Sequence, residues 1–295
     1  MQKKDIRMLR DAALLLEKED PQIAEGLMEM AQRERPDAPF IKRKMNEYKQ
    51  RRDRDQMKLL DLIQTGELAI ISAGFRCHTK IQLAEMLGIK QPSLPFDSGF
   101  FPPQSIANLL RNREVNLQFA SAGLPTHHVC TKHTGVTRGD KKGIDFRTSS
   151  YDHINQAIHA ADQDDLNTYL DATKGYYTLD TVNRFVLAHY NWHDFASESL
   201  SKGITRPEEN IPKINTTLNP RITRMFDMCA RAKNILFVLG EFQNLNFMSI
   251  DDEVHDLTDM EPIKSAAKDT FGDKAKVVRF QDIDHPSKLL KHIAR

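Results

Sequence analysis

The chain has 295 residues, of which 40% are apolar and 28% are charged, a composition that is ordinary for a globular protein. Its net charge of +1 excludes a strongly basic nucleic-acid binder, and no run of about eighteen apolar residues predicts a membrane span. The amino terminus lacks the apolar core of a secretory signal and the three cysteines are far apart, so we expect a cytoplasmic location. Walker-type and Gly-x-Gly-x-x-Gly loops are absent, which excludes the usual nucleotide fingerprints.

Residues 1–66 predict an all-helical extension. Leu9, Ala12, Ala13, Leu15 and Leu16 form an apolar helical face, and proline residues separate two further helical patterns. A helical hairpin followed by a longer helix resembles one tetratricopeptide-type unit. Because one such unit cannot bury a solenoid core, we expect it to pack on the main domain or on a second copy, which would make a homo-oligomer.

Residues 67–295 predict one α/β domain. Apolar runs predict buried strands, and helical patterns lie between them. This alternation indicates a layered, mainly parallel central sheet flanked by helices, with a papain-like α+β fold as the alternative. Proline at the first helical position predicts a helix beginning at Pro220. The predicted strands are Leu68–Ala73, Arg184–Tyr190, Asn234–Leu239 and Lys276–Phe280.

Cys77 is the leading candidate for a nucleophile. It follows a predicted strand and Gly74, and a helical pattern begins at the cysteine itself. The unpaired N–H groups and the dipole of a helix N-terminus favour a thiolate, and Arg76 and His78 add positive or ionisable groups. A thiolate of this kind performs covalent acyl chemistry. The alternative is that Cys77 is a small apolar residue packed under the sheet.

A cysteine nucleophile needs a base and a group that orients the base. His193 is our preferred base because it precedes Asp194, although adjacent side chains in an extended chain point apart; His189, at the end of a predicted strand, is the alternative. We expect both Cys77 and His189 at the carboxyl ends of parallel strands. Asp97 either orients the histidine or caps the turn at Ser98–Gly99.

Residues 121–150 have little periodicity and are rich in glycine, threonine, serine and histidine, which predicts a loop that lines a site. His127, His128, Cys130 and His133 could bind a metal, but their spacing fits no standard zinc motif, and we predict none. We prefer the interpretation that this loop lines a pocket that binds an anion. Its predicted substrate-binding residues are Lys141 and Lys142, together with Gly74, Arg76 and His78 around the cysteine.

Four blocks of the sequence resemble a bacterial domain family of unknown function that is catalogued as papain-like cysteine peptidases. Ala73 and Arg76 depart from that family's first motif, whereas Cys77 matches it. The resemblance covers roughly residues 68–290 and implies a cysteine–histidine pair and a surface-polysaccharide context. The blocks are Ser72–Cys77, Leu94–Asp97, His193–Phe195 and Arg221–Met225, the last of which precedes Ile235–Val238.

The start of the cysteine helix is also similar to the Gly-Asn-Cys opening of capsule-biosynthesis acetyltransferases, which bind coenzyme A. The resulting hypothesis is a cysteine-dependent acyl-transfer enzyme, a hydrolase or an acyltransferase that acts on a small molecule or a glycan. A coenzyme A thioester would be a suitable donor. The two alternatives are a glycan- or nucleotide-sugar-binding transferase with a structural cysteine, and a non-catalytic interaction protein whose helical extension recruits partners.

Overall fold

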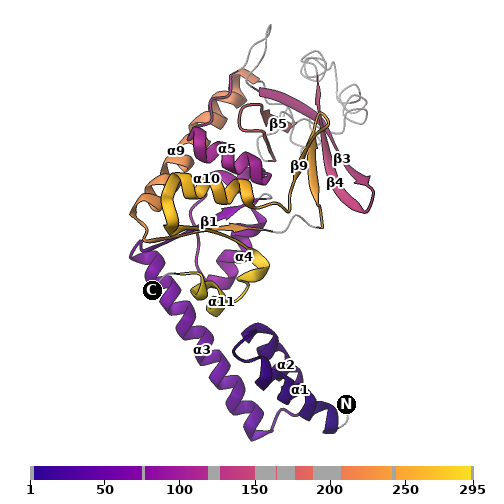
Figure 1. Cartoon of the computed structure of the whole chain (residues 1–295), viewed down its shortest axis with the longest axis vertical. Helices are drawn as coiled ribbons and strands as arrows, with labels where there is room; N and C mark the ends of the chain where they lie inside the picture. Colours follow the sequence, from indigo (N-terminus) through magenta and orange to yellow (C-terminus); the bar gives the residue numbers. More distant parts are fainter. Residues whose placement is uncertain are drawn as a thin grey trace.

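The computed structural model describes residues 3–74, 77–118, 127–149, 164, 177–188, 207–240 and 244–293 (Figure 1). For residues 3, 127–134, 149, 207 and 208 it describes the backbone alone. The chain is a mixed α/β protein with a small parallel sheet, a larger mixed sheet and a helical extension at the amino terminus. The predicted α/β class is therefore confirmed.

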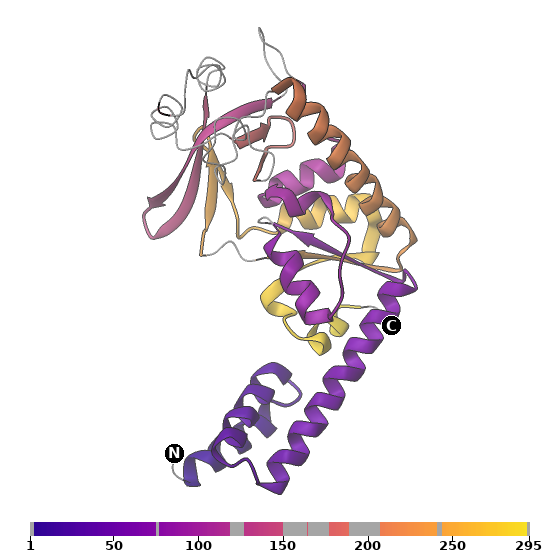
Figure 2. The same ribbon diagram turned by 180° about the vertical axis from the view of Figure 1, so that it is seen from behind.

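The extension consists of α1 (Lys3–Leu16), α2 (Pro21–Glu34) and α3 (Pro39–Gln64), as the sequence predicts. The Asp20 carboxylate accepts a hydrogen bond from the Ile23 N–H and caps α2. The α1–α2 hairpin buries a small apolar core of its own against the start of α3. The long helix α3 then leads to the main body of the molecule (Figures 1 and 2).

The parallel sheet consists of β1 (Leu68–Ala73), β7 (Asn234–Leu239) and β10 (Ala275–Arg279) in the order β1-β7-β10. Successive residues of β1 alternate between two apolar clusters, because side chains of a strand point alternately to its two faces. Helices cover both faces (Figure 1). On one face lie α3, α4 (His78–Leu87) and α11 (Pro286–Lys291), and on the other α5 (Pro103–Asn112), α9 (Pro207–Arg231) and α10 (Glu261–Phe271).

The larger sheet has seven strands in the order β2-β6-β5-β3-β4-β8-β9, and only the β4–β8 pair is parallel. The expectation of a mainly parallel sheet therefore holds for three strands and is wrong for these seven. Short hairpin connections impose antiparallel pairing. The strands are β2 (Gly99–Phe100), β3 (His127–Arg138), β4 (Lys141–Ser149), β5 (Tyr177–Asp180), β6 (Phe185–Leu187), β8 (Phe247–Ile250) and β9 (Glu253–Asp256).

Two local predictions need correction. The segment expected to be a loop contains the β3–β4 hairpin, whose two-residue turn places Gly139 at a φ of 65°. The helix expected to begin at Pro220 begins at Pro207, and Pro220 lies inside it. Tertiary contacts hold this helix: the Asn215 and Asn219 side chains each exchange two hydrogen bonds with the extended backbone of residues 115–117. The helices expected near residues 151–172 lie outside the described residues, apart from Asp164.

One ion pair and one buried polar contact join the helical hairpin to the carboxyl-terminal helix. Lys288 Nζ lies 3.3 Å from Asp20 Oδ1, and Nε2 of His285, whose pKa is lowered by burial, lies 3.8 Å from Glu25 Oε2. Across the ranges that the structure describes, no helix is both long enough and apolar enough to cross a membrane.

Candidate active site

The turn from β1 to α4 is held by hydrogen bonds from distant parts of the chain. The Ala73 carbonyl accepts from the Gly240 N–H at 3.1 Å and from Thr79 Oγ1 at 3.3 Å, and the Gly74 carbonyl accepts from the Phe101 N–H at 3.2 Å. Gly74 adopts a φ of 113°, which side-chain-bearing residues rarely adopt. The predicted glycine therefore makes the turn possible, and tertiary contacts fix it.

Cys77 lies at the N-cap position of α4, as the sequence predicts. Its thiol is free and half-buried, its side chain makes no capping hydrogen bond, and its carbonyl accepts the Ile81 N–H at 3.0 Å. The first N–H groups of a helix lack intrahelical partners and favour negative charge. This position therefore suits a thiolate or an oxyanion. His78 is exposed, whereas Arg76 lies outside the described residues.

Asp97 forms the buried polar centre of this region, with 6% of the residue exposed. Its Oδ1 accepts the Ser72 hydroxyl at 2.6 Å, and its Oδ2 accepts the Leu94 N–H at 2.8 Å. Lys80, one helical turn beyond Cys77, places Nζ 3.5 Å from the same Oδ2. Asp97 therefore caps the turn at Leu94 rather than at Ser98–Gly99, and it connects β1 to the first turn of α4.

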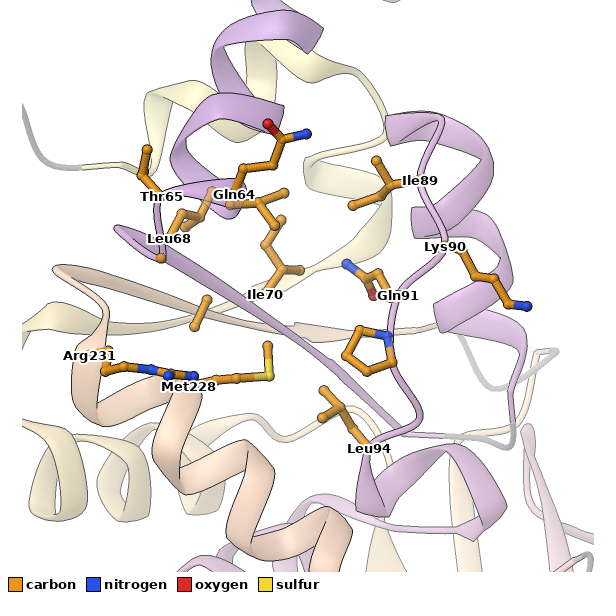
Figure 3. A pocket seen from close by; sticks show the side chains of 14 residues that line it. Gln64, Thr65, Leu68, Ile70, Ile89, Lys90, Gln91, Leu94, Met228 and Arg231 are labelled. Carbon is orange, nitrogen blue, oxygen red and sulfur yellow. The ribbon is translucent and has the colours of Figure 1, made fainter.

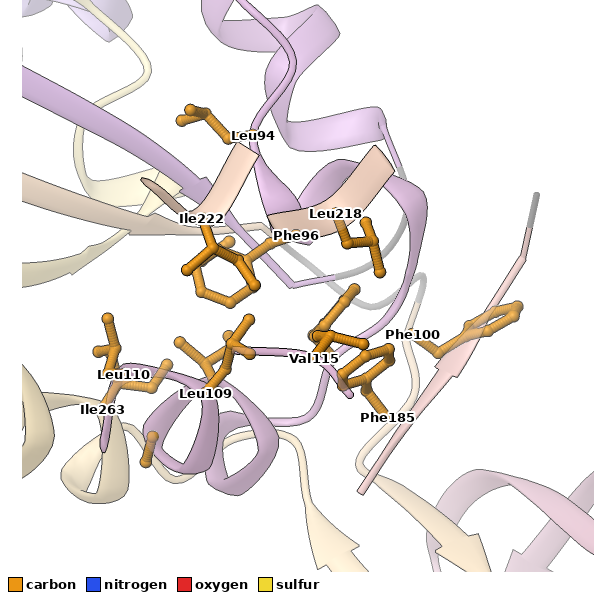
Figure 4. Packing of buried hydrophobic residues seen from close by; sticks show 14 of the residues in the cluster. Leu94, Phe96, Phe100, Leu109, Leu110, Val115, Phe185, Leu218, Ile222 and Ile263 are labelled. Atoms are coloured by element: carbon orange, nitrogen blue, oxygen red, sulfur yellow. The ribbon is translucent and has the colours of Figure 1, made fainter. Parts of the chain in front are cut away.

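The 3-10 turn η1 (Pro95–Ser98) that carries Asp97 is anchored by a buried phenylalanine. Phe96 is 1% exposed and packs in the same apolar cluster as Leu109 and Ile222 (Figure 4). Its ring also meets the Phe101 ring edge-on, with centroids 5.3 Å apart. A buried aromatic ring immediately before the carboxylate fixes where that carboxylate lies.

Two arginines of α9 hold the same segment from the other side. Arg221 donates to Ser98 Oγ at 2.7 Å, and Arg224 donates to the Ser93 carbonyl at 3.1 Å. In the sequence these arginines stand out only through the family resemblance, which does not indicate their role. Their three-residue spacing on one helix face is the signal that could have indicated a shared target. Three of the four blocks that carry the family resemblance thus meet around Asp97.

The histidine candidates, His189 and His193, lie outside the described residues, as does Asp194. The strand before them, β6, pairs antiparallel with β2 and β5, so the expectation that His189 follows a strand of the parallel sheet is wrong. The carboxyl end of β6 nevertheless reaches the candidate site. The Ala188 N–H donates to the Ser98 carbonyl at 2.9 Å, next to Asp97.

A small cavity of about 180 Å³ lies at the carboxyl ends of β7 and β10. Its lining includes Gly240 and Arg279, and Arg279 donates to the Thr258 carbonyl at 3.0 Å. A Cβ at Gly240 would come within 1.9 Å of Thr79 Oγ1, so this strand end lies directly against the first turn of α4. The cavity and Cys77 therefore share one edge of the parallel sheet. The sequence analysis missed Arg279, which is the last residue of β10.

The segment predicted to be a loop lining a pocket for anions contains the β3–β4 hairpin. Lys141 and Lys142 are exposed at the turn of the β3–β4 hairpin, which lies to one side of α4 in both views (Figures 1 and 2). Among the contacts of the described residues, none joins either lysine to Cys77 or Asp97. The side chains of His127, His128, Cys130 and His133 are not described; the side chains that are described include no cluster of three metal-binding groups.

Cys229, in α9, is a natural contrast to Cys77. It is fully buried, and burial raises the pKa of its thiol to about 12. A thiol of this kind is inert at neutral pH. Cys229 is therefore a core residue.

No family model, curated protein or solved structure matches the chain. The family resemblance therefore stays a prediction, and the functional argument depends on the site itself.

Proposed function

We propose that this protein is a cysteine-dependent acyl-transfer enzyme with Cys77 as its nucleophile. The observation that carries the proposal is the position of the free thiol. Cys77 is half-buried, its side chain makes no capping hydrogen bond, and it lies at the start of α4 on the carboxyl edge of the parallel sheet. Ligands of α/β sheets bind at this edge. A papain-like arrangement is part of the same proposal, because the chain combines a cysteine at the start of a helix with a mainly antiparallel sheet.

In the proposed reaction the Cys77 thiolate attacks the carbonyl carbon of an acyl donor. A carbon–sulfur bond forms, the bond to the leaving group breaks, and the leaving group takes a proton. N–H groups at the start of α4 stabilise the oxyanion. Water or a sugar hydroxyl then attacks the thioester and releases the thiol. The donor is an ester, an amide or a coenzyme A thioester, and a surface polysaccharide precursor is the acceptor or substrate we favour.

His193, or alternatively His189, acts as the proton shuttle in this proposal. The hydrogen bond that holds Ala188 against Ser98 supports it, because Ala188 directly precedes His189 in the sequence and Ser98 directly follows Asp97. Asp97 or Asp194 orients the histidine. Both oxygens of Asp97 already accept hydrogen bonds, so its first role is to position the segment between Leu94 and Ser98.

A second candidate function is a glycan- or nucleotide-sugar-binding transferase with a structural cysteine. The observation that favours it is Arg279, which is among the residues that line the cavity at the same sheet edge. Arginine suits phosphate recognition because its planar donors match the phosphate oxygens. In this candidate the thiol of Cys77 would have no role in turnover.

Site-resolved alkylation distinguishes the two candidates. The intact protein is treated with iodoacetamide at pH 7, and each cysteine-containing peptide is quantified by mass spectrometry over time. We expect Cys77 to react at least tenfold faster than free N-acetylcysteine and Cys229 to remain unmodified, since the thiolate is the reactive form. Incubation with acetyl-coenzyme A or p-nitrophenyl acetate should then leave an acyl group on Cys77. A Cys77 that reacts no faster than N-acetylcysteine and forms no thioester would remove the acyl-transfer proposal.

A further inference from the structure

A second cavity lies at the opposite, amino-terminal edge of the parallel sheet. It has a volume of about 400 Å³, within the range of small-molecule sites. Its walls come from the end of α3, the start of β1, residues 89–94 and the last turns of α9 (Figure 3). Most of the lining side chains are apolar, among them Ile63, Ile70, Ile89 and Met228.

Gln91 lies in this cavity beside Ile70 and Pro92 (Figure 3). Only 9% of the residue is exposed, and its Oε1 has no hydrogen-bond partner in the described part of the chain. A buried acceptor without a donor is unfavourable, because it has given up water and gained no partner. A rotation of the side chain that brings Oε1 to the cavity surface would let a ligand N–H or O–H group complete it.

Two cations, Lys90 and Arg231, contribute to the cavity lining, and both residues are exposed. The nearby groups of negative charge, which are the last carbonyls of α9 and the Glu67 carboxylate, already have cationic partners. Lys274 Nζ donates to the Cys229 and Ala232 carbonyls at 2.9 Å, and so caps the carboxyl end of α9. The neighbouring Glu67 forms an ion pair with Lys233 at 3.1 Å. The rim of the cavity is therefore net positive.

We propose that this cavity binds a small amphipathic anion. The ligand has an apolar body that packs on Ile70 and Met228, one N–H or O–H donor that bonds to Gln91 Oε1, and a carboxylate or phosphate that faces Lys90 and Arg231. N-acylated amino acids have this chemistry. The site lies at the other end of β1 from Cys77, so it does not depend on the proposed acyl transfer.

Calorimetry with three probes tests each feature of the proposed ligand. N-octanoylglycine carries the amide N–H and the carboxylate, decanoate lacks the amide, and N-octylacetamide lacks the charge. We expect N-octanoylglycine to bind about tenfold more tightly than either of the others, which corresponds to about 1.4 kcal/mol for one hydrogen bond or ion contact.

Three variants sharpen the test. Gln91→Met should remove the advantage over decanoate, Arg231→Met should remove most of the advantage over N-octylacetamide, and Ile89→Trp should fill the cavity and abolish binding. Arg111→Met, a change of an exposed arginine on α5, is the matched control and should leave all three affinities unchanged. Thermal melts verify that each variant is folded.

Three results would overturn the proposal: no binding of N-octanoylglycine at millimolar concentration, equal affinities for the three probes, or undiminished binding to a folded Ile89→Trp variant. If Ile89→Trp does not fold, the Gln91 and Arg231 variants decide the outcome alone. Alkylation of Cys77 is measured separately, so failure of this site and failure of the proposed function are distinguishable.

Discussion

The two edges of the parallel sheet treat buried polar groups in opposite ways. At the carboxyl edge the Asp97 carboxylate accepts a hydroxyl and a backbone N–H and lies beside an ammonium group. At the amino edge the Gln91 carbonyl oxygen is buried among apolar side chains with no donor in the described chain. A satisfied network rigidifies its surroundings, whereas an unsatisfied group favours whatever ligand completes it. The first edge therefore holds its polar groups in fixed positions, whereas the second leaves one acceptor without a donor.

Cys77→Ala should have the largest effect. We expect acyl-transfer turnover to fall to background while the melting temperature stays nearly unchanged, because the half-buried thiol is the proposed nucleophile and contributes little packing. Cys229→Ala is the matched control. It removes a fully buried sulfur and should lower the free energy of unfolding by about 1 kcal/mol with turnover retained. Turnover that persists in folded Cys77→Ala protein would make the cysteine structural.

His193→Ala should lower the rate by about a hundredfold, the usual scale for loss of a general base. His189→Ala should have a smaller effect on the same steady-state rate. The reverse ranking would transfer the role of the base to His189. Two negligible effects would exclude both histidines from the mechanism.

Asp97→Asn tests whether the negative charge of the Asp97 carboxylate stabilises the carboxyl edge of the parallel sheet. We expect the free energy of unfolding to fall by about 2–3 kcal/mol in urea titrations, since the variant loses charge-assisted hydrogen bonds at a buried site. Alkylation of Cys77 should also slow. Asp145→Asn is the control: it removes a buried carboxylate of the larger sheet, which binds Arg147 and Ser249, and should destabilise the protein without changing Cys77 reactivity.

Gln91→Leu should have the opposite sign. Replacing an unpartnered buried amide by an apolar side chain of similar size should leave the free energy of unfolding unchanged or raise it by about 1 kcal/mol. Urea titrations under the same conditions as for Asp97→Asn measure the contrast. A loss of more than 1 kcal/mol would mean that the Gln91 amide is already satisfied.

Reversal of the charges of Lys141 and Lys142 to glutamate should have the smallest effect. Both side chains are exposed on a hairpin turn, so we expect the affinity for an anionic acyl donor to fall about two- to threefold at low salt. The effect should vanish as salt rises, since exposed charges are screened over about 10 Å at 0.1 M. Calorimetry with coenzyme A and nucleotide sugars measures it. We expect alkylation of Cys77 to stay unchanged in this variant. A loss of alkylation would contradict the prediction that the two lysines only attract the anionic donor.

Local signals were sufficient for the helical extension and for the three strands of the parallel sheet. Continuous apolar runs between helical patterns predict four buried parallel strands. Three of them form the parallel sheet, whereas the fourth forms β6, which pairs antiparallel with β2 and β5. The β3–β4 hairpin was missed for a physical reason. Its residues carry no regular apolar alternation, and its strands are stabilised by pairing with β5 and β8, which come later in the chain.

The sequence by itself determined that a glycine and then a cysteine stand between a buried strand and a helix, because strand, turn and helix signals are all local. Only the tertiary structure decided which groups surround that cysteine. Ser72 meets Asp97 across 25 residues and Arg224 meets Ser93 across 131, and no local pattern specifies such pairs. The same holds for Gln91, which is buried because segments from α3, β1 and α9 pack around it. Burial is a property of the assembled fold, and it turns an ordinary polar residue into a candidate binding group.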